Sequence, residues 1–75
     1  MESKIKEMIR DCMKNCYAKC RINSFEHVYD YVKGFDTIHV FKADTSLTDF
    51  IGNKIRTNVY IEYNWKGFAE KIYWD

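Results

Sequence analysis

Residues 58–74 read NVYIEYNWKGFAEKIYW and carry six aromatic side chains around a Lys66-Gly67 step. Apolar and polar residues alternate on both sides of this step, which is typical of two half-buried strands joined by a tight turn. With a two-residue loop, the facing pairs are Trp65 with Phe68, Glu62 with Lys71, Ile61 with Ile72, Tyr60 with Tyr73 and Val59 with Trp74. A three-residue loop would set Glu62 against Glu70, so the sequence predicts the tighter turn.

This pairing separates the hairpin into an apolar face and a mixed face. The apolar face holds Val59, Ile61, Tyr63, Trp65, Phe68, Ile72 and Trp74. The mixed face holds Asn58, Tyr60, Glu62, Asn64, Ala69, Lys71 and Tyr73. Because helices bury apolar surface, we expect them to cover the first face and to leave Tyr60 and Tyr73 exposed on the second.

Upstream of the hairpin, residues 37–43 read TIHVFKA and predict a further strand, since β-branched and aromatic residues dominate. Ser46, Asp49 three residues later and a closing Gly52 then predict a short helical insert. A loop carrying the same apolar anchors fits this stretch almost as well.

Two helices are predicted before these strands. The first covers residues 2–21, where apolar side chains recur at helical spacing. The second covers residues 25–33, with Ser24 as its cap and Gly34 at its end. Strand-forming Val and Tyr residues in this second segment argue for a strand, but the helical period sorts its apolar residues better.

Together these elements predict an α+β fold: two N-terminal helices packed on one face of a small three-stranded antiparallel sheet that ends in a C-terminal β-hairpin, with a short helical insert between strands 1 and 2. A chain of 75 residues, 47% hydrophobic and without proline, has room for one core, so residues 1–75 are expected to form a single compact domain.

Net charge and the lengths of apolar runs argue against several partners and cellular locations. Twelve Lys and Arg against eleven Asp and Glu leave a net charge of +1, too small for a field that implies nucleic acid. No apolar run is long enough to cross a bilayer, and the N-terminal segment is too charged for a signal peptide. We therefore expect a cytoplasmic protein that does not bind membranes.

Three cysteines, Cys12, Cys16 and Cys20, lie four residues apart on the first predicted helix. Their Cβ atoms would be about 5 to 6 Å apart, beyond the roughly 3.5 to 4.5 Å of a disulfide. A metal site would require them to converge with His27 or His39, and the C-x2-C spacing that favours zinc is missing. No orienting group or oxyanion hole accompanies these thiols, so the sequence predicts no metal, no cofactor and no enzyme.

The function predicted from these features is protein binding, through the exposed sheet face and hairpin tip. In size and composition the chain resembles the small inhibitors and adaptors carried by phages and other mobile elements. The residues expected at the interface are Tyr60, Tyr73, Glu62, Lys71, Trp65 and Lys66.

Two other partners fit the same face. Single-stranded nucleic acid is the alternative, with bases stacking on the sheet aromatics. It would be aided by the basic residues of the first helix, which are Lys4, Lys6, Arg10, Lys14 and Lys19. Association of the chain with itself as a homodimer is the third option.

Overall fold

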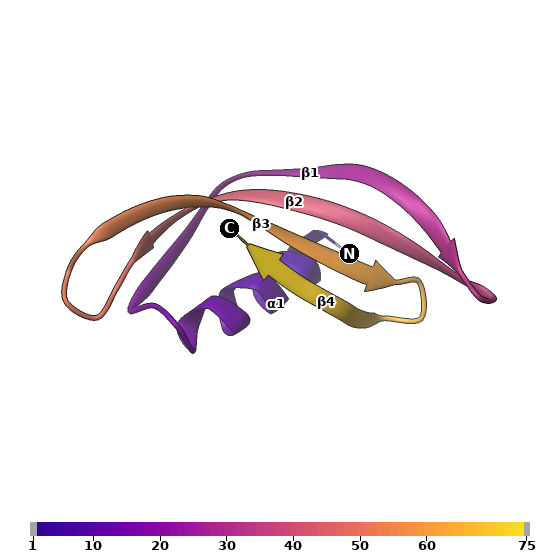
Figure 1. Ribbon diagram of the computed structural model, residues 1–75, viewed down its shortest axis with the longest axis horizontal. Coiled ribbons are helices and arrows are strands. Elements are labelled where there is room, and N and C mark those ends of the chain that lie inside the picture. The colour runs from indigo at the N-terminus through magenta and orange to yellow at the C-terminus, as the bar shows by residue number, and fades with distance from the viewer. Residues whose placement is uncertain (1, 75) are drawn as a thin grey trace.

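One helix and four strands make up the structure, a computed structural model that describes residues 2–74. Their order is α1 (Glu2–Lys14), β1 (Lys19–Lys33), β2 (Asp36–Thr48), β3 (Lys54–Asn64) and β4 (Phe68–Trp74). The strands form one antiparallel sheet in the order β1-β2-β3-β4, so each pairs with its neighbour in sequence. The sheet arches over α1, which lies beneath its concave side (Figure 1). No helix in this part of the chain is long and apolar enough to span a membrane.

The core lies between α1 and the concave side of the sheet. Ile5, Ile9 and Met13 recur every fourth residue on one stripe of α1, and all three are fully buried. They pack against side chains of β2 and β3, which are Ala43, Leu47, Val59, Ile61 and Tyr63. Full burial of each large aliphatic side chain stabilises the fold by about 1.5 to 3 kcal/mol, so this stripe holds the helix on the sheet.

The first helix is shorter than predicted, since it ends at Lys14 rather than near residue 21. The Tyr17 amide still donates to the Met13 carbonyl at 2.8 Å, but the Ala18 amide donates to the Thr48 carbonyl at 2.8 Å. Once that bond forms, the chain has joined the sheet and can no longer continue the helix. Cys20 therefore lies in β1 and not on a helical stripe.

The predicted second helix is wrong, because residues 25–33 belong to β1. Two irregularities in the pairing of β1 with β2 leave Asn23 and Val28 without a directly opposed residue. Each such β-bulge shifts the side-chain alternation by one residue. The two-residue period is thereby interrupted, and an interrupted strand period can imitate a helical one. The strand propensities of Val28 and Tyr29 were the better signal.

Gly34 closes a hairpin and not a helix. Lys33 pairs with Asp36, so only Gly34 and Phe35 form the loop between β1 and β2. Gly34 has a φ of 63°, whereas no residue other than glycine among those described has a positive φ. A glycine of positive φ followed by a residue of negative φ is the combination found in type II′ hairpin turns.

The predicted helical insert is also wrong, since β2 continues through Ser46 to Thr48. The following turn is held by Asp49, whose Oδ1 accepts from the amides of Ile51 at 3.0 Å and Asn53 at 2.7 Å. The predicted arrangement of two helices on three strands is therefore incorrect, although the broad α+β class is right. A segment expected to be helical supplies the fourth strand.

The C-terminal hairpin follows the predicted register except at its tip. Four predicted pairs are confirmed: Glu62 with Lys71, Ile61 with Ile72, Tyr60 with Tyr73 and Val59 with Trp74. Near the turn, however, Asn64 pairs with Phe68, so the loop has three residues. A register shift leaves Glu70 unpaired and restores the predicted pairing beyond it.

Candidate binding surface on the outer face of the sheet

The convex side of the sheet is here called the outer face, and no helix formed by residues 2–74 lies over it (Figure 1). Side chains alternate along β2, so Ile38 and Val40 point to this face while Ala43 faces α1. Both are nevertheless 0% exposed. Their neighbours on the adjoining strands are aromatic or long: Tyr31 is opposite Ile38, and Tyr29 is opposite Val40. The outer face thus buries a small apolar centre under its own side chains.

Four tyrosines and one glutamate form what we call the tyrosine cluster: Tyr29, Tyr31, Tyr60, Tyr73 and Glu62. The rings of Tyr60 and Tyr73 stack with centroids 5.2 Å apart and planes at 9°. The rings of Tyr29 and Tyr31 are 6.4 Å apart and tilted. The Tyr31 hydroxyl donates to Glu62 Oε1, so the cluster is joined across β1, β2 and β3.

The protonation of the cluster follows from these contacts. Donation to the Glu62 carboxylate, with burial and nearby negative charge, raises the pKa of Tyr31 to about 12. Burial, and then the charge of Glu62, raises the pKa of Tyr73. Both phenols are therefore neutral hydrogen-bond donors at physiological pH. Lys71 Nζ lies 5.0 Å from the Tyr73 ring centroid, where a cation is attracted to the ring.

Further along the outer face, toward the turn between β2 and β3, lies a group of cations that we call the basic quartet: Lys19, Arg21, Lys54 and Arg56. The register places Ser46 between Arg21 and Arg56, and Thr48 between Lys19 and Lys54. These six residues also line a shallow groove of about 820 Å³ at this end of the sheet. Its other lining residues, Cys20, Leu47 and Ile55, alternate to the concave side.

Only one member of the basic quartet is neutralised within residues 2–74. Arg56 forms a two-point ion pair with Asp44, with Nη2 to Oδ2 at 2.6 Å and Nε to Oδ1 at 3.1 Å. This contact lowers the pKa of Asp44, so the carboxylate stays charged. Lys19, Arg21 and Lys54 form no ion pair with a described residue, so this end of the outer face is positively charged.

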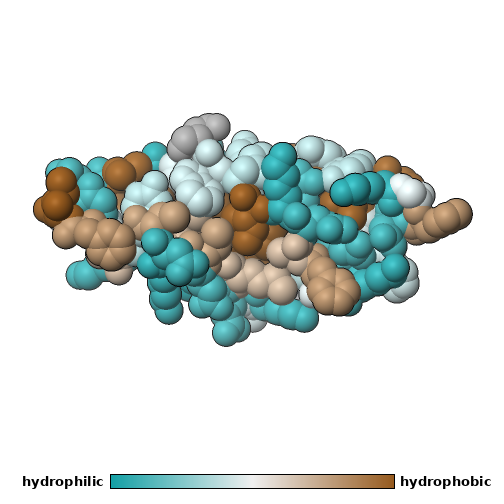
Figure 2. Space-filling view, turned by 60° about the horizontal axis from the view of Figure 1, so that its bottom comes forward, coloured by the Kyte–Doolittle hydropathy of each residue, from teal (hydrophilic) through white to brown (hydrophobic). Residues whose placement is uncertain are grey.

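The two hairpin turns at the other end of the sheet are tied together. Lys66 Nζ lies 3.1 Å from Asp36 Oδ1, and the Trp65 amide donates to the Thr37 carbonyl at 3.4 Å. Exposed apolar side chains gather there, namely Val32, Phe35, Trp65 and Phe68. Phe50 and Ile51 are exposed in the turn at the opposite end. Figure 2 shows hydrophobic side chains at both ends of the long axis.

The predicted interface residues lie in two places. Tyr60, Glu62, Lys71 and Tyr73 meet on the outer face, in the register expected for them. Trp65 and Lys66 lie in the turn at the hairpin tip, where the Lys66 amine is 5.7 Å from the Trp65 ring centroid. The predicted burial of Trp65 and Phe68 under helices is wrong, because both side chains are exposed.

Sequence reasoning missed the other half of this surface. Tyr29 and Tyr31 were assigned to a helix, and Lys19 was assigned to the basic side of the first helix, although all three lie in β1. The strand propensity of residues 28–32 was the signal that could have placed the two tyrosines. The remaining basic residues of α1 lie on the opposite side of the sheet from the tyrosine cluster.

No family model, no curated protein and no solved structure matches the chain.

Proposed function

We propose that this chain is a protein-binding module and that its outer face docks on an acidic surface of the partner protein. One observation carries the proposal: the register puts the basic quartet and the tyrosine cluster on the same face of the sheet, the face that α1 leaves uncovered. Tyrosines offer large contact area at low cost in conformational entropy, and their hydroxyls stay hydrogen-bonded in a wet interface.

Charge complementarity argues for an acidic partner. Lys19, Arg21 and Lys54 present three cations that form no ion pair within residues 2–74, beside the hydroxyl side chains of Ser46 and Thr48. Ser46 is opposite Arg56 of the quartet, and Lys42, four residues away on β2, is opposite Tyr60. The quartet and Tyr60 are therefore about 13 Å apart along the sheet. A single protein surface can reach both. Carboxylates facing the quartet would steer association and set its orientation.

Single-stranded nucleic acid is the second candidate, because the basic quartet lies on the same face as Tyr60 and Tyr73. Phosphates would pair with the cations, and bases would stack on the rings. Three carboxylates beside the rings oppose it: Glu26, Glu62 and Glu70 belong to the strands that carry the tyrosine cluster. Glu26 also holds Lys42 in an ion pair of 3.1 Å. A phosphate backbone crossing the cluster would meet these negative charges, whereas a protein can present donors to them.

The test is photo-cross-linking in cells that naturally express the chain. Asn58 is exposed on the outer face, opposite Asp44, and lies on β3 between Arg56 of the quartet and Tyr60. We replace it by a benzophenone amino acid, and place the same group at Glu7 of α1 in a second variant. A specific adduct is expected from position 58 and none from position 7.

Charge reversal supplies the matched control. The variant R21E/K54E reverses two cations of the quartet, and R10E/K14E reverses two exposed cations of α1 on the other side of the sheet. The adduct at position 58 should disappear in the first and persist in the second. An adduct that nuclease removes would overturn protein binding in favour of nucleic acid. An adduct from position 7 alone would show that the docking face is wrong.

A further inference from the structure

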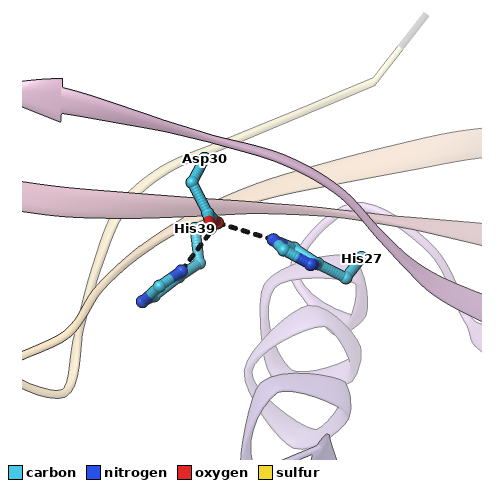
Figure 3. A group of neighbouring side chains, drawn as sticks. All are labelled: His27, Asp30 and His39. Atoms are coloured by element: carbon cyan, nitrogen blue, oxygen red, sulfur yellow. Dashed lines mark hydrogen bonds and ion pairs between the residues drawn. The ribbon is translucent and has the colours of Figure 1, made fainter.

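Three potential metal ligands converge on the side of the sheet opposite to the proposed binding face. His27 Nε2 lies 2.6 Å from Asp30 Oδ1, and His39 Nδ1 lies 2.7 Å from the same oxygen. Figure 3 shows both imidazole rings pointing toward the Asp30 carboxylate from neighbouring strands. The three ligand atoms all lie within 4.8 Å of one another. Among residues 2–74, no other group of three His, Cys, Asp or Glu side chains converges in this way.

A β-bulge creates this cluster. His27 and Asp30 are three residues apart, so regular alternation would place them on opposite faces of β1. The unpaired Val28 shifts the alternation, which brings both side chains to the same face. His39 is directly opposite Asp30 on β2, and His27 is opposite the neighbouring Phe41. Bulges that redirect side chains recur next to functional sites.

We propose that His27, Asp30 and His39 bind a zinc ion, with the fourth coordination position open to water or to an external ligand. Two imidazole nitrogens and one carboxylate oxygen are a ligand set that zinc accepts, and three protein ligands with one open position are typical of reactive rather than purely structural zinc sites. This inference is independent of the proposed protein-binding function, since it uses the other face of the sheet.

The present geometry needs little adjustment to hold the ion. Zinc bonds of about 2.0 to 2.1 Å in a tetrahedron set neighbouring ligand atoms about 3.3 Å apart, so each contact to Asp30 would open by about 0.7 Å. Each imidazole would bind the metal through a lone pair on the nitrogen that now faces Asp30, with a proton on its other ring nitrogen.

Access and surroundings fit a site that exchanges with solvent. The side chains of His27, Asp30 and His39 are 47%, 43% and 29% exposed, so an ion can enter without unfolding of the sheet. The Phe41 ring, 5.1 Å from the His27 ring, forms an apolar boundary on the side that faces α1. Such an apolar boundary limits solvent access on one side of the His27 ring.

The test is calorimetric titration of the full chain with zinc chloride. The three free cysteines are first replaced in C12A/C16A/C20A, since Cys16 is exposed and thiols bind zinc. We expect one zinc per chain. Affinity should fall by about tenfold or more in each of H27Q, D30N and H39Q. The matched control is D36N, which makes the same change in the same hairpin at a carboxylate that pairs with Lys66; it should bind zinc normally.

A second measurement covers the case in which the cysteine-free chain does not fold. In the chain with its native cysteines, one equivalent of zinc should shift the imidazole NMR signals of both His27 and His39. Cobalt in place of zinc should give a tetrahedral spectrum without a thiolate charge-transfer band. Absence of binding, binding that survives in H39Q and D30N, or a thiolate band would each overturn the proposal.

Discussion

The two faces of the sheet are buried in different ways. On the concave side, a separate element, α1, covers aliphatic residues of β2 and β3. On the outer face, Ile38 and Val40 are equally buried, and among residues 2–74 their neighbours on this face belong to the sheet itself. A sheet therefore does not need a second layer to exclude water from part of a face, provided that large amphipathic side chains stand beside the apolar ones. The tyrosines that cover this centre keep their outer edges available to a partner.

The largest expected effect tests the concave side. Ile9→Ala removes a fully buried side chain from the middle of α1, and should lower the free energy of unfolding by about 2 to 5 kcal/mol. Urea denaturation followed by circular dichroism measures the change. A loss below 1 kcal/mol would mean that α1 is not packed on the sheet as described.

Ile38→Ala makes the same change on the outer face. The tyrosine rings that cover Ile38 can move into part of the space, so we expect a loss near the lower end of that range, about 2 kcal/mol. The same denaturation experiment compares the two variants directly. A cost as large as that of Ile9→Ala would show that the outer face is packed as rigidly as the main core, and a negligible cost would show that its apolar centre is absent.

A smaller effect is expected from the stacked pair. Tyr73→Leu keeps an apolar side chain opposite Tyr60 but removes the ring contact of 5.2 Å, and should cost about 0.5 to 1.5 kcal/mol. A double-mutant cycle with Tyr60→Leu isolates the interaction energy of the two rings, with the thermal unfolding of both single variants and the double variant as the measurement. Additive effects of the two changes would contradict stacking in solution.

The smallest expected effect concerns the titration of the Tyr31 phenol. Tyr31 has a pKa of about 12, above the unfolded value, because its neutral hydroxyl donates to Glu62. Its contribution to stability is thus complete below the unfolded pKa near 10, and is lost as the pH rises toward 12. Glu62→Gln should lower the pKa of Tyr31 toward the usual value.

Phenolate absorbance measures that shift, and Tyr31→Phe identifies the step that belongs to this residue. Two results together would show that the hydrogen bond between the two side chains is not present in solution. The high-pH absorbance step would remain in Tyr31→Phe, and Glu62→Gln would leave the pKa of that step unchanged.

The first and last hairpins differ in how well the sequence predicted them. In the β3–β4 hairpin, alternation is regular over residues 59–62, and the predicted partners of these residues are the observed ones. In the β1–β2 hairpin, the bulges at Asn23 and Val28 interrupt the alternation, and the segment was predicted to be helical. A bulge is decided by pairing with a neighbouring strand, so one strand alone gives no sign of it.

The candidate sites divide in the same way. Tyr60, Tyr73, Glu62 and Lys71 were identified because their strands are adjacent in sequence and regular. The basic quartet comes from strands separated by the whole of β2, and the cluster of His27, Asp30 and His39 depends on a bulge. Both were outside the reach of local patterns, and the expectation of no metal site considered His27 and His39 only as additional ligands for the cysteines.

By itself, the sequence determined the local features of this protein: the amphipathic stripe of α1, the pairing in the body of the last hairpin and the mixed face that carries Tyr60 and Tyr73. Only the tertiary structure decided where α1 ends, that residues 25–33 are a strand, and which charged and histidine side chains meet. The physical reason is the range of the interactions. Helical and strand periodicities are set by neighbours along the chain, whereas bulges, helix ends and side-chain clusters are set by partners that only the folded sheet brings together.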